Sequence, residues 1–233
     1  MALPKLSTPK YHATVPSTGK DVEFRPYLVK EEKMLMIAAE SQDERQIVGA
    51  MKDLIDACTF GIIDITKLTM FDLEYLFIKL RSKSVGETSK VGLKCSSCET
   101  ENEVTFSLES IAVAIDKDAD MNIDLSDGVG ISMRYPGVND VLDMGGDLSD
   151  VDKMMGMVRS CIDTIYTAEE VFNVKEQSVK EVDDFIDSLS SKQFHRIREF
   201  LEKMPAAEVH AEFNCESCGE KNETVIKGTA NFF

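Results

Sequence analysis

The chain has 233 residues, 43% of them hydrophobic, so it is long enough to bury a core in one or two domains. Its 42 acidic and 26 basic residues give a formal net charge of −16, which repels phosphate backbones and argues against a nucleic-acid partner. We find no apolar run of membrane-spanning length and no signal-peptide pattern at the N-terminus, so we expect neither membrane insertion nor export.

The first part of the chain is predicted to contain an arm, a β-hairpin and two helices. Residues 1–10 show little periodicity and are expected to form an extended N-terminal arm. Alternating apolar residues on either side of a Pro/Ser/Gly turn predict a hairpin over residues 11–27. Helical periodicity between residues 30 and 58 then predicts two amphipathic helices. The first helix is expected to carry four apolar side chains on one face, namely Met34, Leu35, Ile37 and Ala38.

A third helix and a cysteine-bearing hairpin follow. Thr69 and Asp72 fit a capping box at the start of this helix, which then directs apolar side chains to the core. Residues 89–94 and 103–108 are predicted strands on either side of a Cys-x-x-Cys turn, and we call this hairpin the first ribbon.

A similar order of elements begins again after residue 115. The predicted elements are a hairpin at 123–135, helices at 138–144 and 151–166, an inserted helix at 168–188, and a helix from Ser190 to Pro205. Thr167 is expected to cap the inserted helix. Strands at 207–213 and 222–227 flank a second Cys-x-x-Cys turn, and we call this hairpin the second ribbon.

The repeated order indicates an internal duplication. The residues around Arg25 resemble those around Arg134, and in both ribbons Asn-Glu follows the Cys-x-x-Cys at the same distance. We therefore predict an α+β fold with a first repeat at residues 11–115 and a second at 116–233. Each repeat would contain a β-hairpin, helices and a Cys-x-x-Cys ribbon, and the two halves would form a pseudo-dimer.

The four ribbon cysteines are candidate ligands of one structural zinc ion. Cys95, Cys98, Cys215 and Cys218 supply four thiolates, and two Cys-x-x-Cys turns between strands are the usual halves of a zinc ribbon. The stretch of chain between the two pairs is much longer than in a usual ribbon, and a duplication would explain the length. Separate metal knuckles, a disulfide and an unmetallated remnant remain as alternatives.

Other interpretations of the cysteines and of His210 have less support. A redox Cys-x-x-Cys lies at the start of a helix, whereas strand-forming residues follow both turns here. His210 precedes the second turn and is an alternative ligand, although a lone histidine is more often an ordinary surface or core residue. Cys58 and Cys161 lie in apolar helical surroundings and are predicted to be small buried hydrophobes.

The acidic segment at residues 116–124 only partly resembles an EF-hand loop. Met121 stands where the invariant glycine belongs, and Asp127 stands where the bidentate glutamate belongs. We therefore predict a solvated acidic linker between the repeats. The sequence contains no Gly-rich phosphate loop, no nucleophile elbow and no convincing His–carboxylate pair, so we predict no catalytic residue.

Three segments carry a resemblance to a known family. In chain order they are residues 16–20 (PSTGK), 25–33 (RPYLVKEEK) and 72–86 (DLEYLFIKLRSKSVG). Followed by the first ribbon, they resemble the baseplate hub assembly proteins of T4-like contractile-tailed bacteriophages, most strongly over residues 10–108. None of the segments is a catalytic motif, and the zinc prediction rests on the cysteines of this sequence alone.

The resemblance implies a non-enzymatic hub component or hub assembly factor that docks with other phage baseplate hub proteins. It implies the cytoplasm of the infected bacterium during assembly, or the virion tail baseplate, as the place of action. Basic residues at Lys20, Arg25 and 81–83 are candidate contacts. The competing class is a zinc-ribbon regulator that binds nucleic acid or transcription machinery. The glutamates on both ribbons argue against that class.

Overall fold

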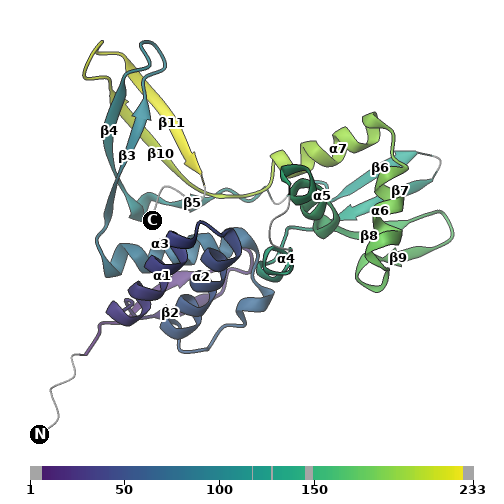
Figure 1. The fold of residues 1–233 in the computed structure, drawn as a ribbon, viewed down its shortest axis with the longest axis horizontal. Coiled ribbons are helices and arrows are strands. Elements are labelled where there is room, and N and C mark those ends of the chain that lie inside the picture. The colour runs from purple at the N-terminus through teal and green to yellow at the C-terminus, as the bar shows by residue number, and fades with distance from the viewer. Residues whose placement is uncertain (1–6, 117, 127, 145–148, 228–233) are drawn as a thin grey trace, which may run out of the picture. The chain divides into compact units, whose positions relative to one another are not determined.

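The computed structural model describes residues 7–116, 118–126, 128–144 and 149–227, and Figure 1 shows the fold. The chain divides into two compact units, which we call the first unit (residues 1–115 and 205–233) and the second unit (residues 116–204). Most of the predicted arm, and Asp127 of the acidic segment, lie outside the described residues. No helix in the described part of the chain has the length and apolar character that a membrane span requires.

The first unit begins with the predicted hairpin and helices. Its elements are β1 (Tyr11–Thr14), β2 (Asp21–Phe24), α1 (Val29–Ser41), α2 (Glu44–Cys58), a 3₁₀ turn (Ile65–Lys67) and α3 (Met70–Ser84). The capping box at the start of α3 is confirmed, because the Thr69 hydroxyl and the Asp72 carboxylate each accept the other's backbone N–H. Helices α2 and α3 bury large apolar side chains, among them Met51, Ile55, Leu73, Phe77 and Leu80.

Helix α1 buries a narrower face than the sequence predicted. Leu35 and Ala38 lie in the core, but Met34 and Ile37 are 46% and 67% exposed. At about 100° per residue, Leu35 and Ala38 lie close together around the helix, and Met34 and Ile37 both lie on the solvent side of that pair. Of the predicted apolar face, therefore, Leu35 and Ala38 reach the core, whereas Met34 and Ile37 remain at the surface.

The two ribbons are antiparallel hairpins in the first unit. The first ribbon consists of β3 (Thr88–Lys94) and β4 (Glu101–Ser107), and the second of β10 (Ala207–Asn214) and β11 (Lys221–Lys227). A 3₁₀ turn (Leu108–Ser110) and the short β5 (Ala112–Val113) follow the first ribbon, and β5 pairs with β10. Figure 1 shows the four long strands extending together away from the helices.

The second ribbon does not belong to the unit that precedes it in the chain. Alternate residues of β10 are buried, namely Ala207, Val209 and Ala211, and this strand contacts α3 and β4. Residues 205–233 therefore belong to the first unit, whereas the predicted second repeat runs over residues 116–233. The repeat boundaries and the pseudo-dimer remain predictions.

The second unit packs helices on a four-stranded antiparallel sheet with the order β6-β7-β8-β9. Its elements are β6 (Asn122–Ser126), β7 (Val129–Met133), α4 (Val138–Asp143), α5 (Asp150–Cys161), β8 (Ile162–Tyr166), β9 (Val171–Asn173), a 3₁₀ turn (Val174–Glu176), α6 (Val179–Asp187) and α7 (Ser191–Glu202). The core contains Ile131, Val158, Cys161, Ile162 and Ile197, all nearly or fully buried.

Two helix predictions in the second unit are wrong in extent. The helix predicted at 151–166 ends at Cys161, because the β-branched residues that follow pair as β8 with β7. The helix predicted at 168–188 is confined to α6, which Ser178 caps. Thr167 does not cap it: its hydroxyl accepts the N–H of Glu170 (3.0 Å) in the turn between β8 and β9.

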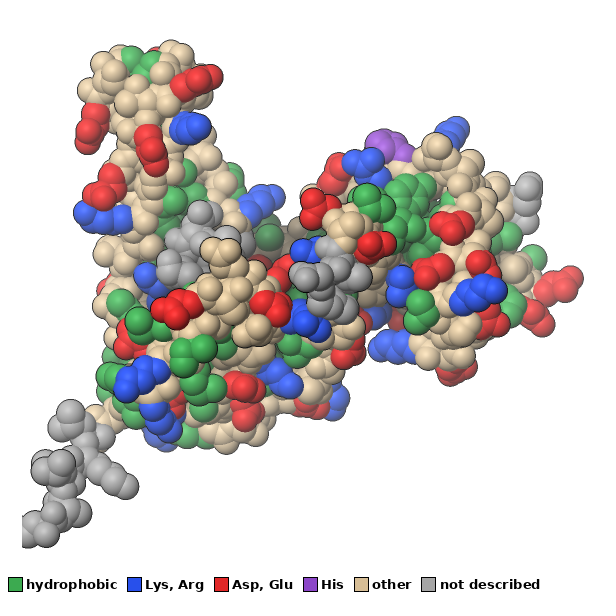
Figure 2. Space-filling model, viewed as in Figure 1, with side chains coloured by type: hydrophobic (Ala, Val, Ile, Leu, Met, Phe, Trp, Pro, Cys, Tyr) green, Lys and Arg blue, Asp and Glu red, His purple; other side chains and the backbone are tan. Residues whose placement is uncertain are grey.

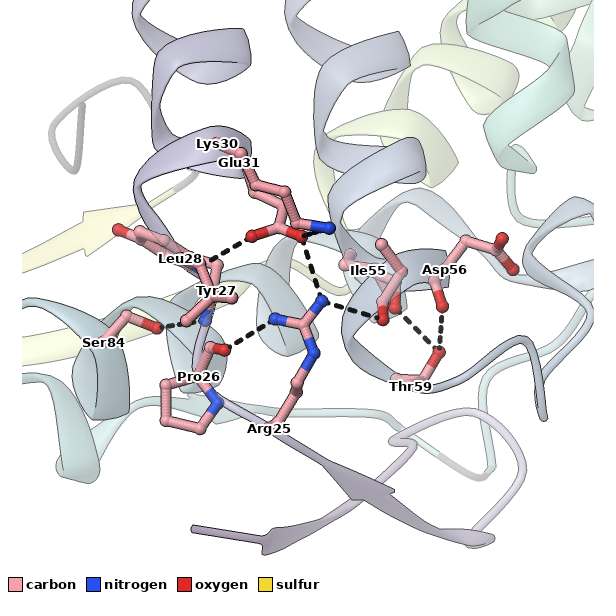
Figure 3. Close-up of polar contacts among 11 residues, drawn as sticks. Arg25, Pro26, Tyr27, Leu28, Lys30, Glu31, Ile55, Asp56, Thr59 and Ser84 are labelled. Carbon is pink, nitrogen blue, oxygen red and sulfur yellow. Dashed lines mark hydrogen bonds and ion pairs between the residues drawn. The ribbon is translucent and has the colours of Figure 1, made fainter. Parts of the chain in front are cut away.

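An arginine in the first unit joins a hairpin to two helices. Arg25 follows β2, and its backbone N–H donates to the carbonyl of Cys58 at the end of α2 (3.0 Å). Its guanidinium donates to the Glu31 carboxylate (2.9 Å) and to the Ala57 carbonyl (3.3 Å). Glu31 also accepts the N–H of Leu28, the N-cap of α1 (2.7 Å; Figure 3). One ion pair thus fixes the start of α1 against the end of α2.

The second unit contains the same arrangement. Arg134 follows β7, and its backbone N–H donates to the carbonyl of Cys161 at the end of α5 (2.7 Å). Its guanidinium binds the Asp140 carboxylate through two hydrogen bonds of 2.7 and 2.8 Å. Asp140 also accepts the N–H of Gly137, the N-cap of α4 (2.6 Å). In both units, therefore, a hairpin, an arginine and a helix-capping carboxylate follow one another in the chain.

Two of the basic residues predicted as contacts are already engaged within the chain. Arg25 is largely buried against Glu31, and the Lys83 ammonium lies 2.6 Å from the Glu87 carboxylate and also pairs with Glu109. The charges of Arg25 and Lys83 are thus balanced within the chain, and their contact with a partner stays a prediction. Lys20, at the end of the first hairpin turn, is exposed.

We predict that Glu31→Ala lowers the free energy of unfolding of the first unit by about 3 kcal/mol, because it leaves the Arg25 charge largely buried without its carboxylate. Urea denaturation measures the change. Glu32→Ala is the matched control: Glu32 lies in the same first turn of α1, but its side chain forms no ion pair within the described residues. An equal loss in both variants would contradict the role of the ion pair.

The same variant makes a pH dependence testable. Burial raises the pKa of Glu31, but hydrogen bonds from Arg25 and from the N–H of Leu28 outweigh it and hold the pKa below its ordinary value. A lowered pKa in the folded state contributes stability that is present above about pH 4.3, the unfolded value, and is lost as the pH falls through the folded value. The difference between wild type and Glu31→Ala should therefore shrink on acidification.

Candidate metal centre

Each Cys-x-x-Cys sequence forms a tight turn between two strands. In the first ribbon, the N–H of Cys95 donates to the carbonyl of Thr100 (2.9 Å) and the N–H of Glu99 to the carbonyl of Cys95 (3.0 Å). Equivalent positions of the second ribbon form the same two bonds, at 2.9 and 2.8 Å. The turn requires a left-handed residue, which is Gly219 (φ 75°) in the second ribbon and Glu99 (φ 57°) in the first. The two turns thus have the same backbone design.

The structure brings the four predicted cysteines together. Their Sγ atoms lie within 4.8 Å of one another, and we call this group the four-cysteine cluster. The distance from Cys95 to Cys218 is 3.7 Å, and that from Cys98 to Cys215 is 3.6 Å. Thiolates at about 2.3 Å from one tetrahedral zinc ion would lie about 3.8 Å apart, whereas a disulfide has an S–S length of about 2.05 Å. The spacing fits a shared metal ion, and all four cysteines are free.

Solvent reaches the four cysteines unequally. The first cysteine of each pair is buried, with Cys95 only 2% and Cys215 only 3% exposed. The second cysteines, Cys98 and Cys218, are exposed. A substrate disulfide would have to reach the first cysteine of a redox pair, so this burial, together with the strands β4 and β11 that follow the turns, disfavours redox catalysis.

Hydrogen bonds prepare two of the sulfur atoms for the thiolate form. The backbone N–H of Cys98 is the main group that lowers the pKa of Cys95 to about 6, and the N–H of Cys218 lowers the pKa of Cys215. The N–H of Glu220 lowers the pKa of Cys218, but the neighbouring sulfur atoms, Cys98 first, raise it to about 12 overall. Four adjacent thiols cannot all ionise without a counter-charge, because the thiolates would repel one another, and a bound cation would supply that charge.

Two asparagines complete the site, and the sequence analysis assigned them no role. The amide nitrogen of Asn222 lies 3.5 Å from the Sγ of Cys95, and that of Asn102 lies 3.6 Å from the Sγ of Cys215. Each asparagine thus reaches the first cysteine of the opposite ribbon. In the sequence, the asparagines are marked by the Asn-Glu pair at the same distance after both turns. This pattern does not show that each asparagine contacts a cysteine of the other ribbon.

The other candidate ligands lie outside this site. Within the described residues, the four cysteines form the one group of three or more His, Cys, Asp or Glu side chains close enough to hold an ion. His210 is an exposed residue whose Nε2 lies 3.5 Å from a carboxylate oxygen of Glu208. In the acidic segment, Asp116 and Asp120 accept nearby backbone N–H groups instead of converging on one point.

A cavity of about 700 Å³ in the second unit, lined by charged and apolar side chains, offers no evident catalytic group. Four of its charged side chains are paired, Arg134 with Asp140 and Arg159 with Asp183 (2.8 Å). The hydroxyl of Ser160 donates to a backbone carbonyl of its own helix (2.8 Å), and no histidine or cysteine is found among the described residues that line the cavity. The cavity therefore lacks an activated nucleophile.

Comparisons with known proteins identify the family. The family model described as "T4 bacteriophage base plate protein" matches residues 8–233. The chain belongs to this family. It is also 28% identical to "Baseplate hub assembly protein gp26" of Enterobacteria phage T4, over 96% of this chain and 98% of that protein. No solved structure matches the chain significantly. The resemblance found in the sequence is confirmed, and it extends over nearly the whole of this base plate family member.

We predict that alkylation of the native protein with iodoacetamide separates the cysteines into classes. Cys58 and Cys161 are fully buried, and burial raises the pKa of each thiol to about 11. Both should remain unmodified until the chain unfolds. Cys98 is exposed, and it should react rapidly only after a chelator has been added, because a cation bound by the cluster would occupy its sulfur atom.

Peptide mass spectrometry before and after chelation measures these rates for each cysteine. The two buried helical cysteines act as internal controls for local unfolding, since their modification would show that the chain had opened. Rapid alkylation of Cys95 or Cys215 without a chelator would contradict a metal site and favour a redox centre.

Proposed function

We propose that this protein is a non-enzymatic component or assembly factor of the phage tail baseplate hub, that it docks with other hub proteins, and that it carries a structural zinc ion. The observation that carries the role is the family match over residues 8–233, together with the full-length similarity to the T4 hub assembly protein. Its place of action would be the cytoplasm of the infected bacterium during assembly, or the virion tail baseplate.

The donor set supports zinc in a structural role. Four thiolates fill all four positions of a tetrahedral zinc ion, whereas a catalytic zinc ion keeps one position open for water or substrate. The sulfur atoms lie within 4.8 Å of one another and come in two pairs from turns of the same design. A site of this kind would stabilise the fold and would supply no reaction.

A bound ion would join stretches of chain that are far apart in the sequence. The chain leaves the first unit after Ile115, forms the second unit, and returns at Pro205. Cys98 and Cys215 are 117 positions apart, so an ion held by both ribbons would close a loop that contains the whole second unit. Two-stranded hairpins are only marginally stable by themselves, and a shared ion would hold this pair together.

The surface of the first unit supports a protein that binds other proteins. Helix α1 exposes four apolar side chains, namely Val29, Met34, Met36 and Ile37. Figure 2 shows hydrophobic side chains at the surface near this helix. Several exposed apolar residues on one helix are more typical of an interaction surface than of a free one. We propose that another baseplate hub protein covers this face.

The competing class, a ribbon that binds nucleic acid, lacks support from the ribbon surface. Nucleic-acid affinity depends on free lysine and arginine side chains. On the ribbons, Lys90 pairs with Glu103 (2.6 Å), and Lys221 pairs with Glu212 and Glu223 (2.9 Å each). Figure 2 shows acidic side chains along the strands that the two ribbons form. This surface would repel a phosphate backbone.

We also propose that the hairpin and the two helices after it are duplicated in the chain. The shared device of Arg25 with Glu31 and Arg134 with Asp140 supports this proposal, because the arginine N–H binds the end of the second helix in both units. Both carboxylates also cap the first helix at the same position.

We predict that protein purified without added zinc contains about one zinc ion per chain, and that chelation lowers the midpoint of thermal unfolding. Mass spectrometry of the metals and calorimetry measure the two effects. Cys215→Ser removes a proposed ligand and should abolish stoichiometric zinc. Cys58→Ala is the control, because it removes a cysteine outside the ribbons and should leave the zinc content unchanged. Wild-type protein without zinc, or with iron instead, would contradict the proposal.

We predict that tagged protein co-purifies with other baseplate hub proteins from infected cells. Comparison with finished particles then decides between two roles: a component remains in the particle, and an assembly factor is absent from it. Ile37→Lys on α1 should reduce the recovery of hub proteins. Val171→Lys is the matched control, since Val171 is equally exposed but lies in the second unit. Normal hub assembly in the absence of this protein would overturn the role.

A further inference from the structure

The two ribbons exchange side-chain hydrogen bonds in a reciprocal manner. The amide oxygen of Asn222, from the second ribbon, accepts the backbone N–H of Ser96 in the first turn (2.8 Å). The amide oxygen of Asn102, from the first ribbon, accepts the N–H of Glu216 in the second turn (2.9 Å). Each asparagine therefore contacts two neighbouring residues of the opposite turn. Its amide nitrogen approaches the Sγ of the first cysteine, and its oxygen accepts the N–H of the next residue.

Both amides are fully used. One amide N–H of Asn102 donates to the carbonyl of Thr100 in its own turn (2.8 Å), and one of Asn222 donates to the carbonyl of Glu220 (2.9 Å). The other N–H points to a sulfur atom, and the oxygen accepts a backbone N–H. The side chains are 4% and 5% exposed, so water does not compete for these bonds. An amide is required here because it both donates and accepts.

We propose that Asn102 and Asn222 are positioning residues of the metal centre: each donates an N–H···S hydrogen bond to the first thiolate of the opposite ribbon and locks the two turns in register. This inference rests on the proposed metal site. A zinc ion with four thiolates leaves a net charge of −2 on the site, by counting ligand charges. Donors at two sulfur atoms offset part of this charge and orient the ligands before the ion binds.

The arrangement explains why asparagine, and not aspartate, stands at both positions. Aspartate has nearly the same shape, but it would remove the donor to sulfur and place a carboxylate beside a thiolate in a buried site. It would keep the oxygen that accepts the backbone N–H, but it would also lose the donor to the carbonyl of Thr100 or Glu220. Asn→Asp is therefore a substitution that preserves packing while it reverses the electrostatic contribution.

The test compares metal affinity in Asn222→Asp, Asn102→Asp and the control Asn214→Asp. Asn214 lies in the same second ribbon beside Cys215, and its substitution adds the same charge, but its side chain is exposed. Competition with a chromophoric chelator measures zinc affinity, and cobalt(II) absorption reports the four-thiolate geometry. We expect a loss of about 10- to 100-fold in affinity for the first two variants, with shifted sulfur-to-cobalt bands, and none for the control. Equal affinity in all three variants would overturn the inference.

A second measurement uses wild-type protein, so it does not depend on whether the variants fold. In protein loaded with ¹¹³Cd, scalar coupling between the metal and a side-chain amide proton passes only through an N–H···S hydrogen bond. We expect coupling to the amide protons of Asn102 and Asn222, and its absence at both would overturn the inference. If wild-type protein binds neither zinc, cobalt nor cadmium, the proposed metal site itself fails. Binding without an effect of either asparagine rejects this inference alone.

Discussion

The two Cys-x-x-Cys turns meet in the first unit and bring together Cys98 and Cys215, which are 117 positions apart in the chain. That unit is made from two separate stretches of chain, with the whole second unit between them. The entropic cost of closing so long a loop grows only slowly with its length, but some interaction must offset it. The β10 strand provides part of that interaction through its buried face and its short pairing with β5. The four-cysteine cluster and the bonds of Asn102 and Asn222 add further contacts at the far ends of the ribbons.

The ribbons need this contact because of their shape. Figure 1 shows their turns extended well away from the helices of the first unit, so none of those helices packs against the turns. Buried apolar residues of β4, Val104 and Phe106, lie nearer the helical end of the strand. At the other end, the buried side chains are Cys95, Cys215 and the two asparagines. Polar and sulfur contacts therefore replace the hydrophobic core where the ribbon leaves it.

The sequence predicted local structure well where one periodicity dominated. The two hairpins, α2, α3 and the capping box of Thr69 are found as expected, because each depends on residues close in the chain. The grouping of the four ribbon cysteines was predicted from the ligands that zinc prefers, and their Sγ atoms do lie within 4.8 Å of one another. Predictions failed where contacts with distant parts of the chain determined the secondary structure or the burial of a residue. Ile162 continued a helical stripe but forms a strand, since β7 offers a partner, and Ile37 had the pattern of a core residue but points outward.

The role of the asparagines could not be read from the sequence, because it depends on which ribbon lies opposite. Once the fold is known, the pattern of contacts is reciprocal: Asn222 serves Cys95, and Asn102 serves Cys215. The sulfur contacts are reciprocal as well, since the first cysteine of each ribbon lies next to the second cysteine of the other. Such reciprocity is typical of a self-complementary contact between two copies of one element. It supports the proposed duplication, and it gives a reason for both ribbons to lie in one unit: neither turn alone would supply four ligands to the proposed zinc ion or a donor to its own first cysteine.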